Sequence, residues 1–96
     1  MGLGYALKEA FVVEKGMFRS RNYRDCGIPT IRDVPSIEVI IIEDPEPMGP
    51  YGAKGISEIA TVPATPAILN AIYDAIGKRV YSIPAKPENI LKLITT

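Results

Sequence analysis

The sequence predicts a small α+β domain, and three patterns carry that prediction. A β-hairpin pattern covers residues 11–19, an apolar strand pattern covers residues 37–43, and an amphipathic helix pattern covers residues 66–76. Strands and helices that follow one another without regular alternation are typical of this class. With 96 residues, of which 47% are hydrophobic, residues 1–96 are expected to form a single domain with a modest core.

The chain opens on a helical pattern that has no visible start signal. Apolar residues recur there at helical spacing: Leu3, Ala6, Leu7 and Ala10. Gly2 and Gly4 oppose a helix, and no capping residue precedes the pattern. We therefore expect that the chain was cut from a longer protein.

A hairpin and an irregular segment follow. Residues 11–14 and 17–19 are rich in β-branched and aromatic side chains and flank Lys15-Gly16, where the glycine permits a tight turn. Between residues 23 and 36, Gly27, Pro29 and Pro35 interrupt any regular pattern, so this segment is expected to run irregularly over a surface.

The clearest strand pattern is residues 37–43. Residues 39–42 are continuously apolar, which predicts a strand covered on both faces in the native assembly. Prolines 45, 47 and 50 then exclude regular structure and stiffen the chain that follows.

The best helix pattern covers residues 66–76. Thr65 is expected to cap it, Pro66 suits its first position, and Gly77 suits its end. A stripe at helical spacing marks its buried face: Ala64, Ala67, Ile68, Ala71, Ile72, Ala75 and Ile76. A short strand at residues 80–83 and a terminal helix at residues 87–94, with Ile90, Leu91 and Ile94 inward, complete the expected fold.

Composition excludes several classes of function. Eleven basic residues balance eleven acidic ones, so neither a nucleic-acid nor an anionic-membrane surface is predicted. There is no histidine, which removes Ser-His and Cys-His catalysis and the usual zinc sites. The single cysteine, Cys26, cannot form an internal disulfide, and together with the lack of a signal peptide or membrane span this favours the cytoplasm. The apolar content is high for a small monomer and predicts an interface.

The strongest candidate site is the stretch from Gly49 to Glu58. Glycines at 49, 52 and 55 recur at every third position, and the carboxylate of Glu58 follows. The spacing matches neither a Walker P-loop nor a GxGxxG fingerprint, so residues alone leave a generic glycine turn and a solvated glutamate as alternatives. The acidic residues at 43, 44 and 46 show no metal-ligand spacing and are interpreted as a solvated loop.

Several motifs resemble the C-terminal end of the molybdenum-binding subunit of the xanthine dehydrogenase, aldehyde oxidase and carbon monoxide dehydrogenase family. The resemblance covers nearly the whole chain, in order, through Gly4–Glu9, Ile28-Pro29-Thr30, Asp33-Val34-Pro35, Gly49–Glu58, Pro63–Gly77, Ile83-Pro84 and Pro87-Glu88. It implies that residues 1–96 are the C-terminal portion of a molybdopterin-binding domain. It also implies a molybdenum-pterin cofactor in the complete enzyme.

The resemblance assigns roles to five residues. Family members hydroxylate a carbon of a purine, another N-heterocycle or an aldehyde, and a glutamate beside the metal accepts a proton; Glu58 matches that glutamate. Lys54, Gly55, Ile56 and Ser57 match the backbone that lies against the cofactor, and no residue here is expected to ligate the metal. Ser57 stands where the family commonly has glycine, which puts the local geometry or the substrate subclass in question.

Two hypotheses for the whole protein follow, and a third ranks below them. In the first, the chain is a C-terminal piece that is inactive without the missing N-terminal part of its subunit and without iron–sulfur and FAD partners. In the second, the chain is a non-enzymatic truncated fragment that folds without cofactor and self-associates as a homo-oligomer. The third is generic small-molecule binding by the glycine loop.

Overall fold

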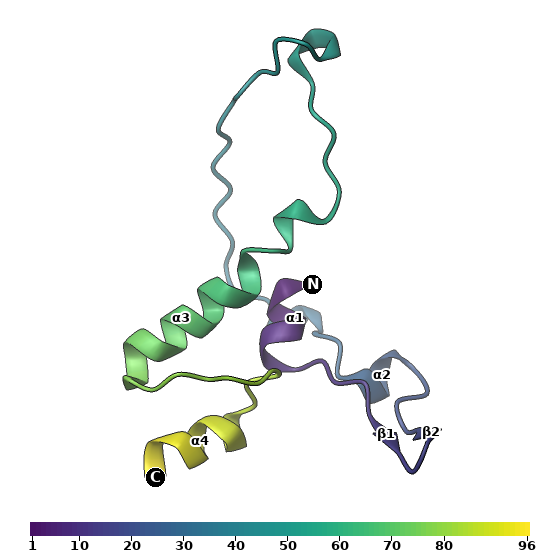
Figure 1. Ribbon diagram of the computed structural model, residues 1–96, viewed down its shortest axis with the longest axis vertical. Coiled ribbons are helices and arrows are strands. Elements are labelled where there is room, and N and C mark those ends of the chain that lie inside the picture. The colour runs from purple at the N-terminus through teal and green to yellow at the C-terminus, as the bar shows by residue number, and fades with distance from the viewer.

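The computed structural model describes residues 1–96 and confirms the α+β class (Figure 1). Two short strands form an antiparallel hairpin, and helices lie on either side of it in sequence. The elements in chain order are α1 (Gly2–Leu7), β1 (Val13–Glu14), β2 (Met17–Phe18), α2 (Tyr23–Cys26), the 3-10 turns η1 (Ile31–Asp33), η2 (Pro50–Gly52) and η3 (Glu58–Ala60), α3 (Ala64–Ile76) and α4 (Pro87–Thr95).

The small core forms where α1 crosses the start of α3. A Cβ atom at Gly2 would overlap that of Ala64, so the glycine that disfavours a helix in isolation is what lets the two helices touch. The Thr65 hydroxyl donates a hydrogen bond to the Gly2 carbonyl at 3.0 Å. On the other side of α1, the Ala85 N–H donates to the Ala6 carbonyl at 2.6 Å, and both alanines are fully buried.

The hairpin forms as the sequence predicts, with Lys15-Gly16 at its turn. Val13 pairs with Phe18, and the rings of Phe11 and Phe18 lie 5.2 Å apart between centroids. Buried Ser20 closes its base, because the hydroxyl accepts from the Val12 N–H at 3.0 Å and donates to the Ala10 carbonyl at 3.2 Å. This pair of bonds ties the two chain segments together where the ladder itself has ended.

The helix predictions are confirmed with shifted boundaries. α3 begins at Ala64, so Thr65 lies inside the helix and its hydroxyl bonds to α1 instead of capping α3. Gly77 ends α3 in the left-handed region at φ 68°, and its N–H donates to the Tyr73 carbonyl at 2.7 Å. Residues 23–36 contain α2 and η1, which the irregular assignment missed; Asn22 caps α2 by accepting from the Asp25 N–H at 3.0 Å.

Both predicted strands outside the hairpin are wrong as secondary structure. Residues 80–83 form no ladder and bend at residues 82 and 83, and residues 37–43 are extended without a partner strand. The expected inward faces of the helices are only partly covered. In α3 the exposed residues include Ala67, Ala71 and Ala75, and in α4 Leu91 and Ile94 are more than half exposed whereas Ile90 is not.

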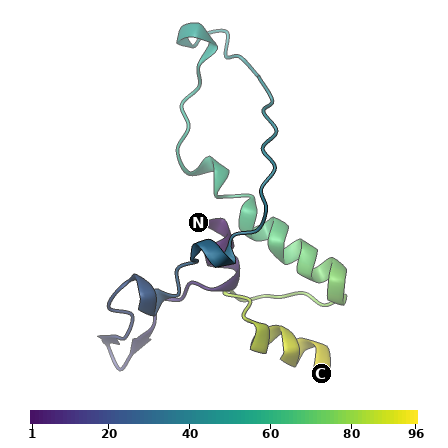
Figure 2. The ribbon, with the colours of Figure 1, turned by 180° about the vertical axis from the view of Figure 1, so that it is seen from behind.

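Residues 34–63 form a long loop that leaves the helices and returns to them (Figures 1 and 2). Helix α1 holds both of its ends. At the entry, Lys8 Nζ lies 2.7 Å from Asp33 Oδ1. At the exit, the loop runs into the start of α3, where Ala64 and Thr65 contact Gly2.

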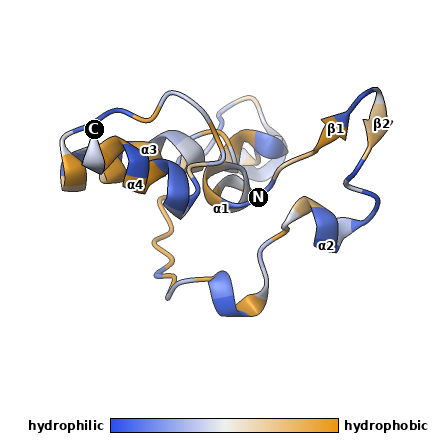
Figure 3. Cartoon of the chain, turned by 90° about the horizontal axis from the view of Figure 1, so that it is seen from below, coloured by the Kyte–Doolittle hydropathy of each residue, from blue (hydrophilic) through white to orange (hydrophobic).

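The chain exposes far more surface than a compact protein of its mass. Its accessible surface is 8434 Å², against roughly 5400 Å² for a compact monomer of 10.5 kDa. Its radius of gyration is 17.5 Å, against about 12.5 Å for a compact domain of this length. Only 5 of 96 residues are buried, and hydrophobic residues lie along the loop and on the outer faces of the helices (Figure 3). The surface therefore has the character of an interface that another part covers.

We expect the isolated chain to unfold with a small enthalpy and to bind a hydrophobic dye. A compact domain of about 100 residues unfolds with about 60–80 kcal/mol at its midpoint, and this chain buries too little surface to reach that value. Differential scanning calorimetry and the fluorescence of 8-anilinonaphthalene-1-sulfonate measure the two properties. A full-sized enthalpy with no dye binding would contradict the interface interpretation.

We expect Lys8→Met to raise the pKa of Asp33. The Lys8 ammonium first, and then the N–H and hydroxyl of Thr30, lower that pKa from 3.8 to about 2. Because the folded-state pKa is lowered, the contribution to stability is present above pH 3.8 and is lost as the pH falls toward 2. Carboxyl NMR titration measures the change; Lys15→Met, in the exposed hairpin turn, is the control. An unchanged Asp33 pKa in Lys8→Met contradicts the assignment.

Candidate functional site

The far end of the long loop is a turn held by its own backbone. The Glu46 N–H donates to the Gly52 carbonyl at 3.0 Å, and the Gly52 N–H donates to the Gly49 carbonyl at 3.1 Å. Lys54 also forms an ion pair with Asp44 across the two arms. Residues 43, 44 and 46 were interpreted as a solvated loop, and Asp44 is indeed exposed. The residue spacing did not mark its ion pair with Lys54. These contacts give residues 44–54 a defined shape in a loop that is otherwise unsupported.

The three glycines of the loop differ in what they do. Gly52 adopts φ 75°, and a Cβ there would lie 3.0 Å from the Pro45 Cβ, so the turn itself needs a glycine. A Cβ at Gly49 would overlap the Ala53 carbonyl oxygen. At Gly55 nothing lies within 4 Å of a Cβ, and its φ is not in the left-handed region. The chain therefore gives no internal reason for glycine at 55, and the space beside it is open.

Residues 54–57 present free backbone donors. The N–H groups of Lys54, Gly55, Ile56 and Ser57 form no hydrogen bond within the chain. They follow one another directly and lead into Glu58, the first residue of η3. The structure thus keeps the predicted cofactor-contacting residues and the predicted base together in one segment, with the donors unused. Such a run of N–H groups can bind an anionic group.

Glu58 lies in the open, not in a dry pocket. Residues 54–58 are all exposed, and so are Ile56 and Ile59, at 78% and 68%. These two isoleucines therefore do not exclude water from Glu58 within this chain, because no second surface closes over them. Ser57 adopts φ −137° and ψ −112°. Its φ is negative, so the expected conflict between serine and a left-handed backbone does not arise here.

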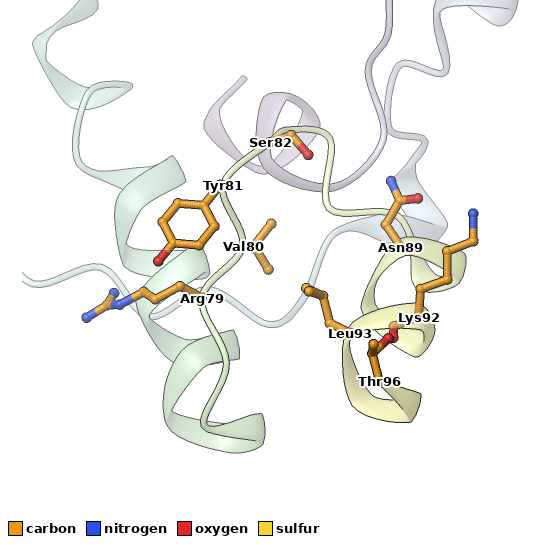
Figure 4. Close-up of a pocket in the computed structure, with 8 residues that line it drawn as sticks. All are labelled: Arg79, Val80, Tyr81, Ser82, Asn89, Lys92, Leu93 and Thr96. Atoms are coloured by element: carbon orange, nitrogen blue, oxygen red, sulfur yellow. The ribbon is translucent and has the colours of Figure 1, made fainter.

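A pocket lies elsewhere, between residues 79–82 and α4, and none of the predicted site residues lines it (Figure 4). Its volume is about 340 Å³. The Arg79 side chain turns toward α3, where a guanidinium nitrogen donates to Asn70 Oδ1 at 2.8 Å and the guanidinium lies 3.9 Å from the centre of the Tyr73 ring. The arginine is thus used within the fold, and the pocket contains no arrangement of catalytic groups.

Two structural features bear on the exclusions made from sequence. No cluster of three or more histidine, cysteine or acidic side chains is placed to hold a metal ion. The stretch Glu58–Ile76 has the length and apolar composition of a membrane span, which is weak evidence alone. Its α-helical part, α3, has 13 residues and is about 20 Å long, short of the roughly 30 Å of a bilayer core.

Comparison with known proteins supports the resemblance seen in the sequence. No family model matches the chain. It is 38% identical over 94 residues to a probable xanthine dehydrogenase subunit of Bacillus subtilis, covering 98% of this chain. It is 34% identical over 92 residues, 94% of the chain, to the xanthine dehydrogenase molybdenum-binding subunit of Escherichia coli O157:H7. Aldehyde oxidoreductases also match. Two of these relatives, the E. coli O157:H7 xanthine dehydrogenase subunit and an E. coli aldehyde oxidoreductase subunit, are named as molybdenum-binding subunits.

A solved structure extends the similarity to the fold. The chain matches quinoline 2-oxidoreductase from Pseudomonas putida 86 with a TM-score of 0.85 and 30% identity over 98% of its residues. The chain spans only 13% of the length of the B. subtilis relative, 12% of the E. coli relative and 12% of the solved chain. The similarity therefore concerns one segment of much larger proteins. It leaves the roles of Lys54–Glu58 as predictions.

Proposed function

We propose that the chain is the C-terminal segment of the molybdenum-binding domain of a molybdenum hydroxylase. The enzyme would hydroxylate an aldehyde, a purine or a related N-heterocycle. The observation that carries the proposal is the segment 54–58, in which unpaired N–H groups lead directly into Glu58. The similarity of nearly the whole chain to molybdenum-binding subunits supports it.

The residues present fit a pterin cofactor. Lys54, Gly55, Ile56 and Ser57 have free N–H groups that can donate to its anionic groups, and the open space at Gly55 allows close approach. When bound, the molybdenum-pterin group would supply the oxidising centre and the oxygen that is transferred to carbon. None of these residues needs to ligate the metal.

Glu58 is the general base of the proposed site. Its carboxylate would accept the proton released as the substrate carbon is hydroxylated, which requires hydrogen-bond reach of that proton. Ile56 and Ile59 flank it as apolar surface that can exclude water once a second surface covers them. The chain thus contributes the base and one wall of the site, and it is inactive alone.

The proposed partners follow from this incompleteness. The remainder of the subunit would supply the other cofactor contacts and the substrate pocket. Iron–sulfur and FAD subunits or domains would carry the electrons away. The large exposed apolar surface of the chain agrees with a part that is covered within such an assembly.

We expect molybdenum to be retained only when the chain is completed. The test uses a fused subunit in which this chain replaces the matched segment of the B. subtilis relative. Elemental analysis after gel filtration should find stoichiometric molybdenum in the fused subunit and none in the isolated chain. The B. subtilis protein without its matched segment is the negative control, and the intact one the positive control. A fused subunit that loses molybdenum while the intact relative keeps it overturns the proposal.

We expect Glu58→Gln in the fused subunit to keep molybdenum and lose turnover. The amide keeps the shape of the side chain but cannot accept the proton, and a general base contributes about 100- to 10,000-fold to the rate. Turnover of xanthine, the substrate in the relative's name, with a dye acceptor measures kcat. Glu46→Gln, in the turn of the same loop, is the matched control and should retain activity. Near-normal turnover in Glu58→Gln rules out the role.

A further inference from the structure

An aromatic pocket lies between α1, the base of the hairpin and α2, and it contains none of the residues used above. Its volume is about 340 Å³. Three rings line it, those of Tyr5, Phe11 and Tyr23, together with one charged group, the carboxylate of Glu9. The faces of aromatic rings attract cations, as a carboxylate does. Such a lining therefore points to a cationic ligand.

Main-chain contacts hold the walls of the aromatic pocket together. The Ala10 N–H donates to the Cys26 carbonyl at 2.9 Å, which joins the segment after α1 to the end of α2. The Ala10 carbonyl accepts from the buried Ser20 hydroxyl at 3.2 Å, at the base of the hairpin. A Cβ at Gly27 would lie 3.0 Å from the Lys8 carbonyl oxygen, so the two segments also meet closely there. The rings thus stand on backbone whose position is fixed.

A glycine makes room for the Glu9 carboxylate. The Glu9 N–H donates to the Gly4 carbonyl at 2.8 Å, and a Cβ at Gly4 would overlap Glu9 Oε1, so the side chain folds back over α1. Glu9 is partly buried, yet no hydrogen bond or ion pair within the chain uses its carboxylate. A charge held partly out of water without a partner is unfavourable. The carboxylate therefore lacks a cation.

Nothing else in the chain supplies that cation. No basic residue lines the aromatic pocket. Lys8 and Arg24 line a neighbouring hollow instead, and Lys8 already pairs with Asp33. The rings of Tyr5 and Tyr23 make no ring or cation–π contact within the chain, and they are exposed by 48% and 81%. The pocket thus presents an unneutralised negative charge between unused aromatic faces.

Among cations, a guanidinium group fits this lining best. It is planar and stacks on an aromatic face, and its fork of N–H groups can donate two parallel hydrogen bonds to one carboxylate. A lysine ammonium carries a compact charge without a flat face. A metal ion would find a single carboxylate here, since no cluster of three ligating side chains exists in the chain. A neutral apolar group would leave the Glu9 carboxylate unpaired.

We propose that the aromatic pocket binds a guanidinium group, presented as an arginine side chain by the protein surface that covers this chain. Arginine and tyrosine are both enriched at the centres of protein interfaces. The exposed rings belong to a larger exposed apolar surface, which has the character of a covered part. A free guanidino compound is the other source of the same chemistry. The inference requires a covering protein and does not depend on the molybdenum chemistry proposed above.

Binding of N-acetylarginine amide to the isolated chain, read from NMR chemical shifts, tests the chemistry of the pocket. We expect a dissociation constant on the order of 1 mM, with shifts at Tyr5, Glu9 and Tyr23, because contacts in an open site are individually weak. N-acetylcitrulline amide has the same shape without the charge and should bind at least about 5-fold more weakly. Equal binding of the two compounds, or binding of neither, overturns the inference.

Variants of the pocket assign the contacts. Glu9→Gln keeps the shape of the side chain and should weaken binding of N-acetylarginine amide about 5-fold. Glu38→Gln removes the same charge from the distant loop and should leave the affinity unchanged. Tyr23→Leu should weaken binding about 2- to 5-fold, whereas Tyr23→Phe keeps the ring and should preserve it. An affinity that Glu9→Gln leaves unchanged overturns the assignment.

The fused subunit described above identifies the source of the guanidinium. If the covering protein supplies it, N-acetylarginine amide should bind the isolated chain and not the fused subunit. Glu9→Gln should then lower the melting temperature of the fused subunit more than Glu38→Gln does, and an equal effect of the two overturns the inference. Equal binding by chain and fused subunit assigns the pocket to a free guanidino compound and overturns the arginine of a covering surface. None of these readouts requires molybdenum, so they stand or fall separately from the proposed function.

Discussion

The close packing of α1 against α3 is the contact on which the other features depend. It requires a residue without a side chain at Gly2, because a Cβ there would overlap Ala64. Through the same helix, Lys8 holds Asp33 at the entry of the long loop, and the Gly2 carbonyl accepts from Thr65 beyond its exit. Bringing together the ends of a loop of this length costs conformational entropy. A six-residue helix thus fixes where a loop of several times its own length leaves and returns.

What α1 cannot supply is cover for the remaining apolar surface. In α3, Ala67, Ala71 and Ala75 are exposed, and the arm at 37–43 is exposed throughout. Burying apolar area yields about 25 cal/mol per Å². The chain exceeds a compact domain of its mass by roughly 3000 Å² of total surface, and the apolar part of that excess is a reserve of such energy. That reserve is available for association with another protein surface. Glu58 is open for the same reason, because no other part of this chain covers it.

Sequence reasoning succeeded where an element carries its own signals. The hairpin turn at Lys15-Gly16 and the end of α3 at Gly77 depend on local backbone preferences, and both were predicted. It failed where the outcome depends on distant residues. Thr65 lies inside α3, which begins at Ala64, and its hydroxyl donates to the distant Gly2 carbonyl. Residues 37–43 form no ladder because no strand of this chain lies beside them. The site residues were predicted from the resemblance to a known family. The unpaired N–H groups of residues 54–57 and the ion pair of Lys54 became visible only in the structure.

The turn at residues 44–54, the tip of the long loop, is shaped mainly by its backbone and not by its charges. The ion pair between Lys54 and Asp44 is exposed, and exposed pairs contribute about 0–1 kcal/mol. The hydrogen bonds across the turn, the prolines and the left-handed Gly52 restrict the two arms more strongly. The tip can therefore act as a stiff link between the arm at 37–43 and the segment ending at Glu58. The base proposed at Glu58 would need such a link, because a flexible loop would leave its carboxylate free to point into solvent.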